Sequence, residues 1–99
     1  MRYIQGKANG REMDELKDYL TDKGFMSGGI WYFRGTWMGK GLLNNLQRSG
    51  LVRRIGTSVD LRKVGVKSMP DRIEYNGRIA GSIFYQVTSL EINSAANLH

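Results

Sequence analysis

The stretch that decides the predicted fold is 41–56, GLLNNLQRSGLVRRIG. Its leucines are spaced three and four residues apart, so they form one apolar stripe on a helix that we expect over 37–49. That stripe consists of Leu42, Leu43 and Leu46. Gly50 is typical of a residue that ends a helix, and 51–55 then has the composition of a short strand with two arginines. The pattern raises the question of whether this helix and strand read DNA or only close a small core.

The face of the 37–49 helix opposite the leucines is polar. At about 3.6 residues per turn, this face holds Trp37, Lys40, Gly41, Asn44 and Arg48, with Asn45 and Gln47 at its edges. Thr36 precedes the helix, and we expect it to be the N-cap.

A first helix is predicted over 11–23 by the same reasoning. Its apolar face holds Met13, Leu16, Tyr19 and Leu20, and its acidic face holds Asp14, Glu15, Asp18 and Asp22. Asn9 is in the N-cap position with Glu12 three residues later, which is the spacing of a capping box, and Gly24 follows as the C′ residue. The acidic face would turn away from nucleic acid, and we interpret it as a solvated surface.

Between these helices, 25–36 reads FMSGGIWYFRGT and is compatible with two structures. Ser27 can cap a short helix over 27–34, although the glycine pair at 28–29 weakens it. IWYFR is also a good strand by composition. We expect the short helix, because a helix-turn-helix arrangement needs a partner for the helix over 37–49.

The rest of the chain is predicted to be rich in strands. Asn76–Gly77 is the preferred dipeptide of a two-residue type I′ turn, and alternating apolar residues lie on both sides of it. These are Ile73, Tyr75, Ile79, Ile83, Tyr85 and Val87. Residues 56–71 have no firm assignment, and we expect the tail over 91–99 to be frayed.

Length and composition indicate a single small domain with one modest core. The chain has 99 residues, 40% of them hydrophobic, and it has no cysteine, which excludes disulfides and thiolate metal sites. Its single histidine is His99. No apolar run is as long as a membrane span, and the N-terminal residues lack the apolar stretch of a secretory signal, so we expect a cytoplasmic protein.

The net charge of +6 is unevenly distributed along the chain. Residues 1–33 hold five basic and five acidic side chains, whereas 34–78 hold ten basic and three acidic ones, a net charge of +7. The ten are Arg34, Lys40, Arg48, Arg53, Arg54, Arg62, Lys63, Lys67, Arg72 and Arg78. An excess gathered in one half of the chain is typical of a surface that binds a polyanion, although ordinary solvated side chains explain it equally well.

The predicted order of elements resembles the winged helix-turn-helix family. The resemblance is carried by LKDYLTDKG at 16–24 and by LLNNLQRSGLVRRIG at 42–56, with SIFYQVTSL at 82–90 as the returning strand of the wing. It implies an α+β fold with three N-terminal helices followed by an antiparallel wing of two to three strands. The single domain would then consist of an arm (1–10), a helical part (11–50), the wing (51–90) and the tail (91–99).

The resemblance also implies a small basic protein that binds double-stranded DNA, of the kind that phages and prophages use as transcription regulators. The 37–49 helix would read bases or hold phosphates with Thr36, Lys40, Asn44, Gln47 and Arg48. The wing would contact phosphates with Arg53, Arg54, Arg62, Lys63, Lys67, Arg72 and Arg78. Neighbours on a strand point to opposite faces, so Arg53 and Arg54 cannot both face one groove. A homodimer would double the site, but no heptad pattern indicates one.

The sequence holds no catalytic constellation, so we expect neither an enzyme nor a cofactor. GTWMGKG at 35–41 lacks the spacing of a P-loop. Asp60, Asp71 and Glu74 are the acids of the basic half, and we expect them to pair with cations rather than to bind a metal.

The main rival hypothesis is a phage-encoded protein that binds a host nucleic-acid enzyme and inhibits or redirects it. A basic hairpin and an aromatic cluster would then form the interface. In that cluster we expect Trp31 and Phe33 in the core, whereas Trp37 lies on the opposite side of its helix from the leucines. Single-strand or RNA binding by the same aromatics is a third reading.

Overall fold

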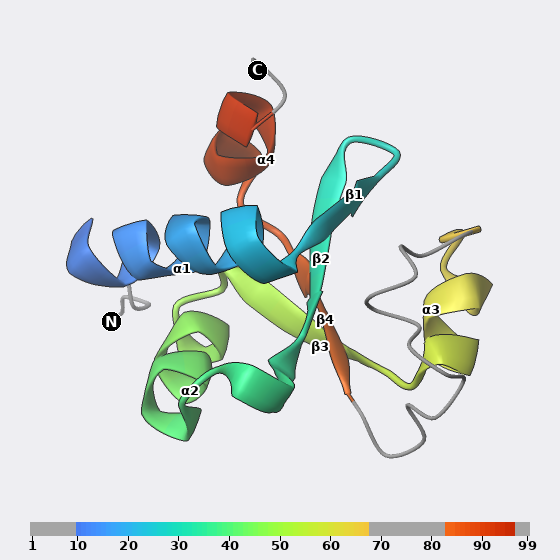
Figure 1. Cartoon of the computed structure of the whole chain (residues 1–99), viewed down its shortest axis with the longest axis horizontal. Helices are drawn as coiled ribbons and strands as arrows, with labels where there is room; N and C mark the ends of the chain where they lie inside the picture. The colour runs from blue at the N-terminus through green and yellow to red at the C-terminus, as the bar shows by residue number, and fades with distance from the viewer. Residues whose placement is uncertain (1–9, 68–82, 97–99) are drawn as a thin grey trace.

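The described residues, 10–67 and 83–96 of a computed structural model, form a four-stranded sheet with helices on both faces (Figure 1). The elements are α1 (Gly10–Lys23), β1 (Phe25–Ser27), β2 (Ile30–Arg34), the 3-10 helix η1 (Gly35–Trp37), α2 (Lys40–Arg48), β3 (Val52–Gly56), α3 (Ser58–Lys63), β4 (Phe84–Val87) and α4 (Leu90–Ala96). All strand pairs are antiparallel, in the order β1-β2-β4-β3.

This architecture contradicts the predicted winged helix-turn-helix fold. Two α-helices rather than three precede β3 in the described chain, and a β-hairpin stands between them. The last strand, β4, is central and pairs with β2 on one side and β3 on the other, so it is not the returning strand of a peripheral wing.

The β1–β2 hairpin replaces the short helix that we expected over 27–34. Gly28 and Gly29 have φ angles of 61° and 80°. A two-residue type I′ turn requires positive φ at both central residues, and glycine adopts that conformation most readily. The helix prediction was therefore wrong, and the composition of IWYFR indicated the correct structure.

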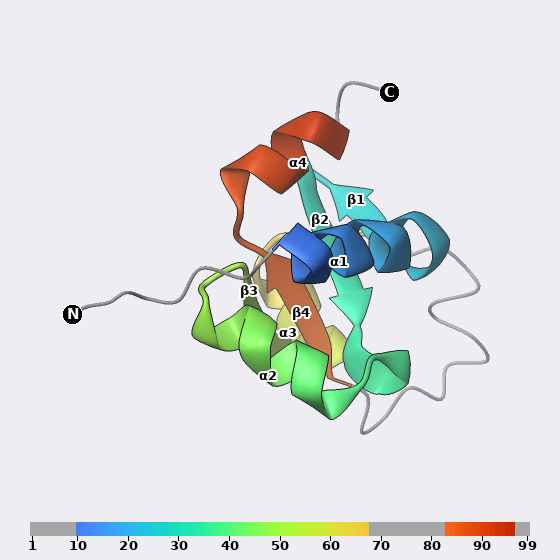
Figure 2. The same cartoon turned by 90° about the vertical axis from the view of Figure 1, so that its left-hand side faces the viewer.

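The two faces of the sheet carry separate cores. Helices α1, α2 and α4 lie on one side of the sheet and α3 on the other (Figures 1 and 2). Phe33 and Tyr85 belong to the core on the side of α1 and α2, whereas Tyr32 and Phe84 belong to the core on the side of α3. The larger core consists of Leu16, Leu20, Phe33, Met38, Leu43, Leu46, Val52, Tyr85, Val87 and Ile92. The smaller one consists of Phe25, Tyr32, Leu61, Val66 and Phe84. The apolar faces predicted for the first helix and the leucine helix both enter the larger core, which confirms them.

The helix α2 is shorter than predicted because the chain breaks at Met38. Gly35–Trp37 form η1, and Met38 is extended, with φ −91° and ψ 139°. This conformation buries the Met38 side chain, which is 7% exposed. The N-cap of α2 is consequently Gly39 and not Thr36.

The C-terminus of α2 confirms the role predicted for Gly50. Gly50 has φ 80°, and its N–H donates to the carbonyl of Gln47 at 3.0 Å. The N–H of Leu51 donates to the carbonyl of Leu46 at 3.0 Å. This pair of bonds is a Schellman motif, which turns the chain sharply into β3.

The helix α3 lies in a segment to which the sequence analysis gave no structure. The Asp60 carboxylate accepts hydrogen bonds from the backbone N–H of Thr57 at 3.0 Å and from its hydroxyl at 3.2 Å. These residues form a capping box. Thr57 and Asp60 have the three-residue spacing of that motif, so the signal was present in the sequence.

The helix α4 occupies part of the tail that we expected to be frayed. Trp31 lies opposite Val87 in the register that pairs Tyr32 with Gln86. The Asn93 carboxamide bridges the two, since its Oδ1 accepts from the Trp31 N–H at 2.9 Å and its Nδ2 donates to the Val87 carbonyl at 3.0 Å. Asn93 therefore replaces a direct bond between β2 and β4 and attaches α4 to the sheet.

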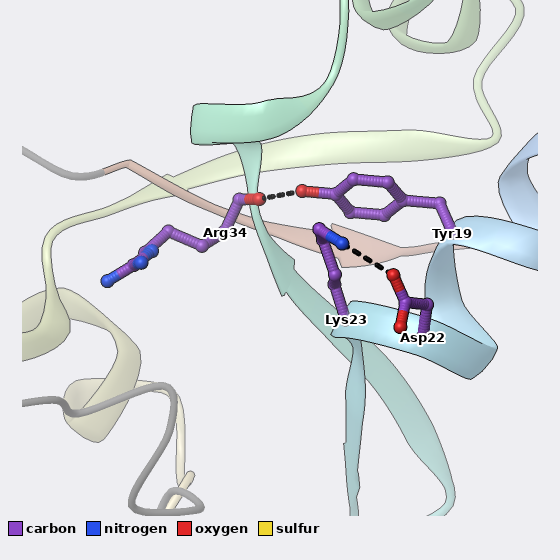
Figure 3. A network of polar contacts seen from close by, with 4 residues as sticks. All are labelled: Tyr19, Asp22, Lys23 and Arg34. Carbon is purple, nitrogen blue, oxygen red and sulfur yellow. Dashed lines mark hydrogen bonds and ion pairs between the residues drawn. The ribbon is translucent and has the colours of Figure 1, made fainter.

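A tyrosine attaches α1 to the other end of β2. The Tyr19 hydroxyl donates to the backbone carbonyl of Arg34 (Figure 3). The Tyr19 ring meets Phe33 edge to face, with centroids 5.4 Å apart. The Arg34 side chain is buried and points away from Tyr19 (Figure 3). These contacts fix α1 on the larger core.

Some predictions fall outside the described residues. The turn at Asn76–Gly77 and the strand before it cannot be compared with the structure, nor can the proposed N-cap Asn9. The side chain of Trp37 is likewise outside the description. Within the described ranges, no helix is long and apolar enough to cross a membrane.

Candidate nucleic-acid interface

Charge is polarised between the elements of the fold. Helix α1 carries three basic and five acidic side chains. Residues 24–67, which include β3, α2 and α3, carry eight basic side chains and one acidic one, Asp60. Seven of the eight are exposed, namely Lys40, Arg48, Arg53, Arg54, Arg62, Lys63 and Lys67. The candidate interface is therefore the surface of α2, β3 and α3.

The outer face of α2 is exposed as the sequence predicted. Lys40, Asn44 and Arg48 follow one another at four-residue intervals and are all exposed, while Gln47 is half-buried at their edge. Asn45 lies on the side of α1, where its Nδ2 donates to the Glu12 carboxylate at 2.7 Å. Glu12 of α1 therefore lies at one edge of this polar face, and Lys40, Asn44 and Arg48 lie farther from α1.

The two arginines of β3 lie on opposite faces of the sheet. Arg53 pairs across the strands with Gln86, and Arg54 with Tyr85. Since Tyr85 points to the face of α2, Arg54 shares that face, whereas Arg53 shares the face of α3. The sequence analysis predicted this separation, and the register confirms it.

Arg53 is held in place by a hydrogen-bonded chain across three strands. Its Nε donates to Oε1 of Gln86 at 2.8 Å, and Nε2 of Gln86 donates to the Tyr32 hydroxyl at 3.1 Å. The two bonds orient the exposed guanidinium, and its terminal nitrogens bond to no residue that the structure describes. Such pre-organisation lowers the entropy lost when an arginine binds a phosphate.

Asp60 is the one acid among the basic residues of 24–67, and its carboxylate is hydrogen-bonded to Thr57. Hydrogen bonds from the backbone and hydroxyl of Thr57 lower the pKa of Asp60, and the nearby charges of Lys63 and Arg54 lower it further. Lys63 belongs to α3 and Arg54 to β3, so Asp60 interacts with charge from both elements. Asp60 offsets part of that charge, and most of it remains.

The structure brings together some predicted site residues and separates others. Arg54 lies on the same face of the sheet as α2, which carries Lys40, Asn44 and Arg48. Arg53 lies on the face of α3, whose segment carries the exposed Arg62, Lys63 and Lys67. Thr36 is exposed in η1, before α2 begins. Arg72 and Arg78 lie outside the described residues.

Sequence reasoning did not find the residues that support the interface. Gln86 and Tyr32 orient Arg53, and the three come from different strands. Gln86 is the one polar residue of β4, and its position in the alternating strand FYQV was the available signal. Its partners could not be identified without the register. In the described part of the chain, no three acidic or histidine side chains are grouped as a metal site would require.

Comparison with protein-family models, with curated proteins and with solved structures found no match.

Proposed function

We propose that the protein binds double-stranded DNA through the surface of α2, β3 and α3, in a role such as the regulation of transcription. The observation that carries the proposal is the charge of these elements: residues 24–67 expose seven cations, which are divided between the two faces of the sheet, and hold a single acid, while α1 bears five acidic side chains. A polyanion gains free energy from such a surface through the release of its counterions.

The α2 side of this surface offers the groups that recognise bases. Asn44 can pair with adenine, and Lys40 or Arg48 can pair with guanine. A nine-residue helix is about 13 Å long, which is enough to present these three side chains to one groove. Arg54, on the same face of the sheet, is available to a flanking phosphate.

The test is a fluorescence anisotropy titration of the protein with random duplex DNA at two salt concentrations. We expect dissociation constants in the range of roughly 10⁻⁴–10⁻⁶ M and a clear loss of affinity at the higher salt. Arg54→Gln should lower the slope of log affinity against log salt by about one. Asn44→Ala should instead change the sequences recovered in a binding-site selection.

A matched control is Lys17→Gln, which removes one exposed positive charge from α1. We expect this variant to keep the salt slope of the wild type, because α1 lies outside the proposed interface. Equal losses for Lys17→Gln and Arg54→Gln would show that only net charge matters. No binding at low salt would refute the proposal.

A second candidate is a protein partner with an acidic extended segment, and the edge strand β3 favours it. Leu51 bonds to Thr88 across the sheet, so the alternate residues Val52 and Arg54 direct their backbone groups away from β4. No described strand pairs with that outer side of β3. An acidic strand could pair there and meet Arg53 and Arg54. Weak DNA binding together with saturable binding of an acidic peptide would favour this function.

A further inference from the structure

Exposed cations lie on both sides of the sheet. Helices α2 and α3 cover opposite sides of it (Figure 1). The side of α2 includes the exposed Lys40 and Arg48, and the side of α3 includes the exposed Arg53, Lys63 and Lys67. The sheet and its two cores lie between these two sets. Because duplex DNA is stiff over such a short distance, a duplex that rests on one set leaves the other uncovered.

The cations of α2 point away from the sheet. Leu46 is 0% exposed and belongs to the larger core. Arg48 lies two residues later, which corresponds to a rotation of about 200° around the helix. Its side chain is therefore on the outer side of α2. The helix holds two basic residues and no acidic one, so its outer side carries a surplus of positive charge.

The outer side of α3 is open to solvent in the opposite direction. Leu61 is 0% exposed and belongs to the smaller core. Lys63 and Val59 each lie two residues from Leu61, so both are on the outer side of the helix. Val59 is 59% exposed, which shows that this side of α3 is accessible. Lys63 therefore points away from the sheet, as Arg48 does on the other side.

Arg53 gives the α3 side a cation of fixed orientation. Its Nε donates to Gln86, whose Nε2 donates to the hydroxyl of Tyr32. Tyr32 is packed in the smaller core with Leu61 of α3. The chain of bonds therefore starts in the core beneath α3 and ends at an exposed guanidinium. A guanidinium that is already oriented binds a phosphate with less loss of entropy than a freely rotating one.

The two sides differ in the chemistry that they present. Asn44 is exposed on α2 between Lys40 and Arg48, and an asparagine can pair with adenine in the major groove. The α3 segment, 58–67, contains neither asparagine nor glutamine, and its exposed polar groups are chiefly cationic. The α2 side is therefore suited to reading sequence, whereas the α3 side is suited to phosphates of any sequence.

We propose that one molecule holds two duplexes at once, one on the α2 side and one on the α3 side, and thereby bridges DNA. The inference rests on the proposed function and adds a second segment of duplex DNA as a partner. The α2 side selects the site, and the α3 side holds any neighbouring duplex through its phosphates. Binding of the second duplex depends on salt in the same way as binding of the first.

The test is the capture of one duplex by another. A biotinylated duplex is fixed to streptavidin beads, and a fluorescent duplex of unrelated sequence is added with and without the full chain. We expect the fluorescent duplex to be retained only when the protein is present. Retention should pass through a maximum as the protein concentration rises, because excess protein occupies the two duplexes separately. Sedimentation velocity of the protein with both duplexes should show a complex of one chain with two duplexes.

Two double variants remove equal charge from the two sides. They are Lys40→Gln with Arg48→Gln on α2, and Arg53→Gln with Lys63→Gln on the α3 side. Each should still bind a single duplex through its intact side, as anisotropy measures. Each should lower the retention of the fluorescent duplex by at least about tenfold, since two fewer phosphates are neutralised at one site. Only the α2 variant should lose sequence preference.

The matched control is Arg11→Gln with Lys17→Gln, which removes two exposed charges from α1. We expect this variant to retain the fluorescent duplex as the wild type does. A melting curve for each variant confirms that it folds. An equal loss of retention in the control and in the two double variants would show that only net charge matters, and it would overturn the bridging proposal.

The remaining outcomes separate bridging from DNA binding itself. If a single duplex binds with the expected salt dependence but the fluorescent duplex is not retained, bridging is wrong and DNA binding stands. If no duplex binds in either assay, both proposals are wrong. If either double variant abolishes binding of a single duplex, one duplex contacts both sides and bridging is wrong. Retention that persists in both double variants would point to self-association and would also overturn bridging.

Discussion

The N-termini of α2 and α3, which precede and follow β3, differ in how their first amides are satisfied. In α3 the Thr57–Asp60 capping box supplies hydrogen bonds and a negative charge from the helix itself. In α2 the N-cap is Gly39, with neither a side-chain cap nor an acid in the first turn. The positive end of α3 is therefore neutralised within the protein, and that of α2 is left open to solvent.

The two helices differ in how much their stability depends on an N-terminal cap. A helix of six residues such as α3 has few internal bonds and depends on its cap. The nine-residue α2 is held by two buried leucines and by the Schellman motif at Gly50, so it depends less on a cap at its N-terminus. Four predictions test this interpretation.

The largest predicted effect is a loss of stability of similar size when a buried leucine of either helix is replaced. Leu46 in α2 and Leu61 in α3 are each 0% exposed. Replacement of either by alanine removes buried apolar surface and leaves a cavity, which should lower the free energy of unfolding by about 2–5 kcal/mol. Chemical denaturation measures both values. A much smaller loss for Leu61→Ala would show that α3 contributes little to the fold.

Loss of a threonine hydroxyl before the helix should destabilise the protein at α3 but not at α2. Thr57→Ala removes a hydroxyl that bonds to Asp60, and it should lower the free energy of unfolding by about 1 kcal/mol. In α2, Thr36→Ala serves as the matched control. Because Thr36 does not cap α2, we expect no measurable change of stability in that variant. A similar loss in both variants would contradict the comparison.

Addition of a cap to α2 should have a smaller effect of opposite sign. Gly39→Asp supplies the missing acceptor and negative charge, and it should raise the free energy of unfolding by a few tenths of a kcal/mol. Thermal melting detects such a change. A fall in stability would mean that the end of α2 cannot accommodate a cap, and that its open amides reflect strain rather than availability.

The smallest effect should be a dependence of stability on pH through Asp60, which lies near the surface. Its pKa is lowered in the folded protein, chiefly by the hydrogen bond from the Thr57 backbone. The resulting stabilisation is complete above the unfolded pKa near 3.8 and is lost as the pH falls below that value. Asp60→Asn should remove this contribution, so the stability gap between variant and wild type should narrow in acid. A constant gap from pH 7 to about pH 3 would exclude the mechanism.

Parts of the fold and interface could be read from local patterns. The leucine stripe, the helix stop at Gly50 and the strand after it depend on neighbours within a few residues. The exposure of Lys40, Asn44 and Arg48 also follows from helical periodicity alone. In the same way, the alternation of a strand predicts that Arg53 and Arg54 lie on opposite faces.

The hairpin at 25–34 was missed for a different reason. The glycine pair at 28–29 is a local turn signal, but we interpreted it through the resemblance to winged-helix proteins. The strand β2 is stabilised by β4, which is about fifty residues away, as the pairing of Tyr32 with Gln86 shows. Local composition favoured a strand over 30–34, but the partner of that strand could not be identified without the tertiary structure.

By itself, the sequence determined the amphipathic helices, the opposite directions of Arg53 and Arg54 and the concentration of positive charge, because these are properties of neighbouring residues. Only the tertiary structure decided which residues from distant segments lie opposite or beside each other. The Asn93 bridge joins residues 62 apart, and a cavity beside α2 is lined by both Lys40 and Tyr85. Such contacts depend on sheet register, and a shift of one residue would turn every side chain of a strand to the other face.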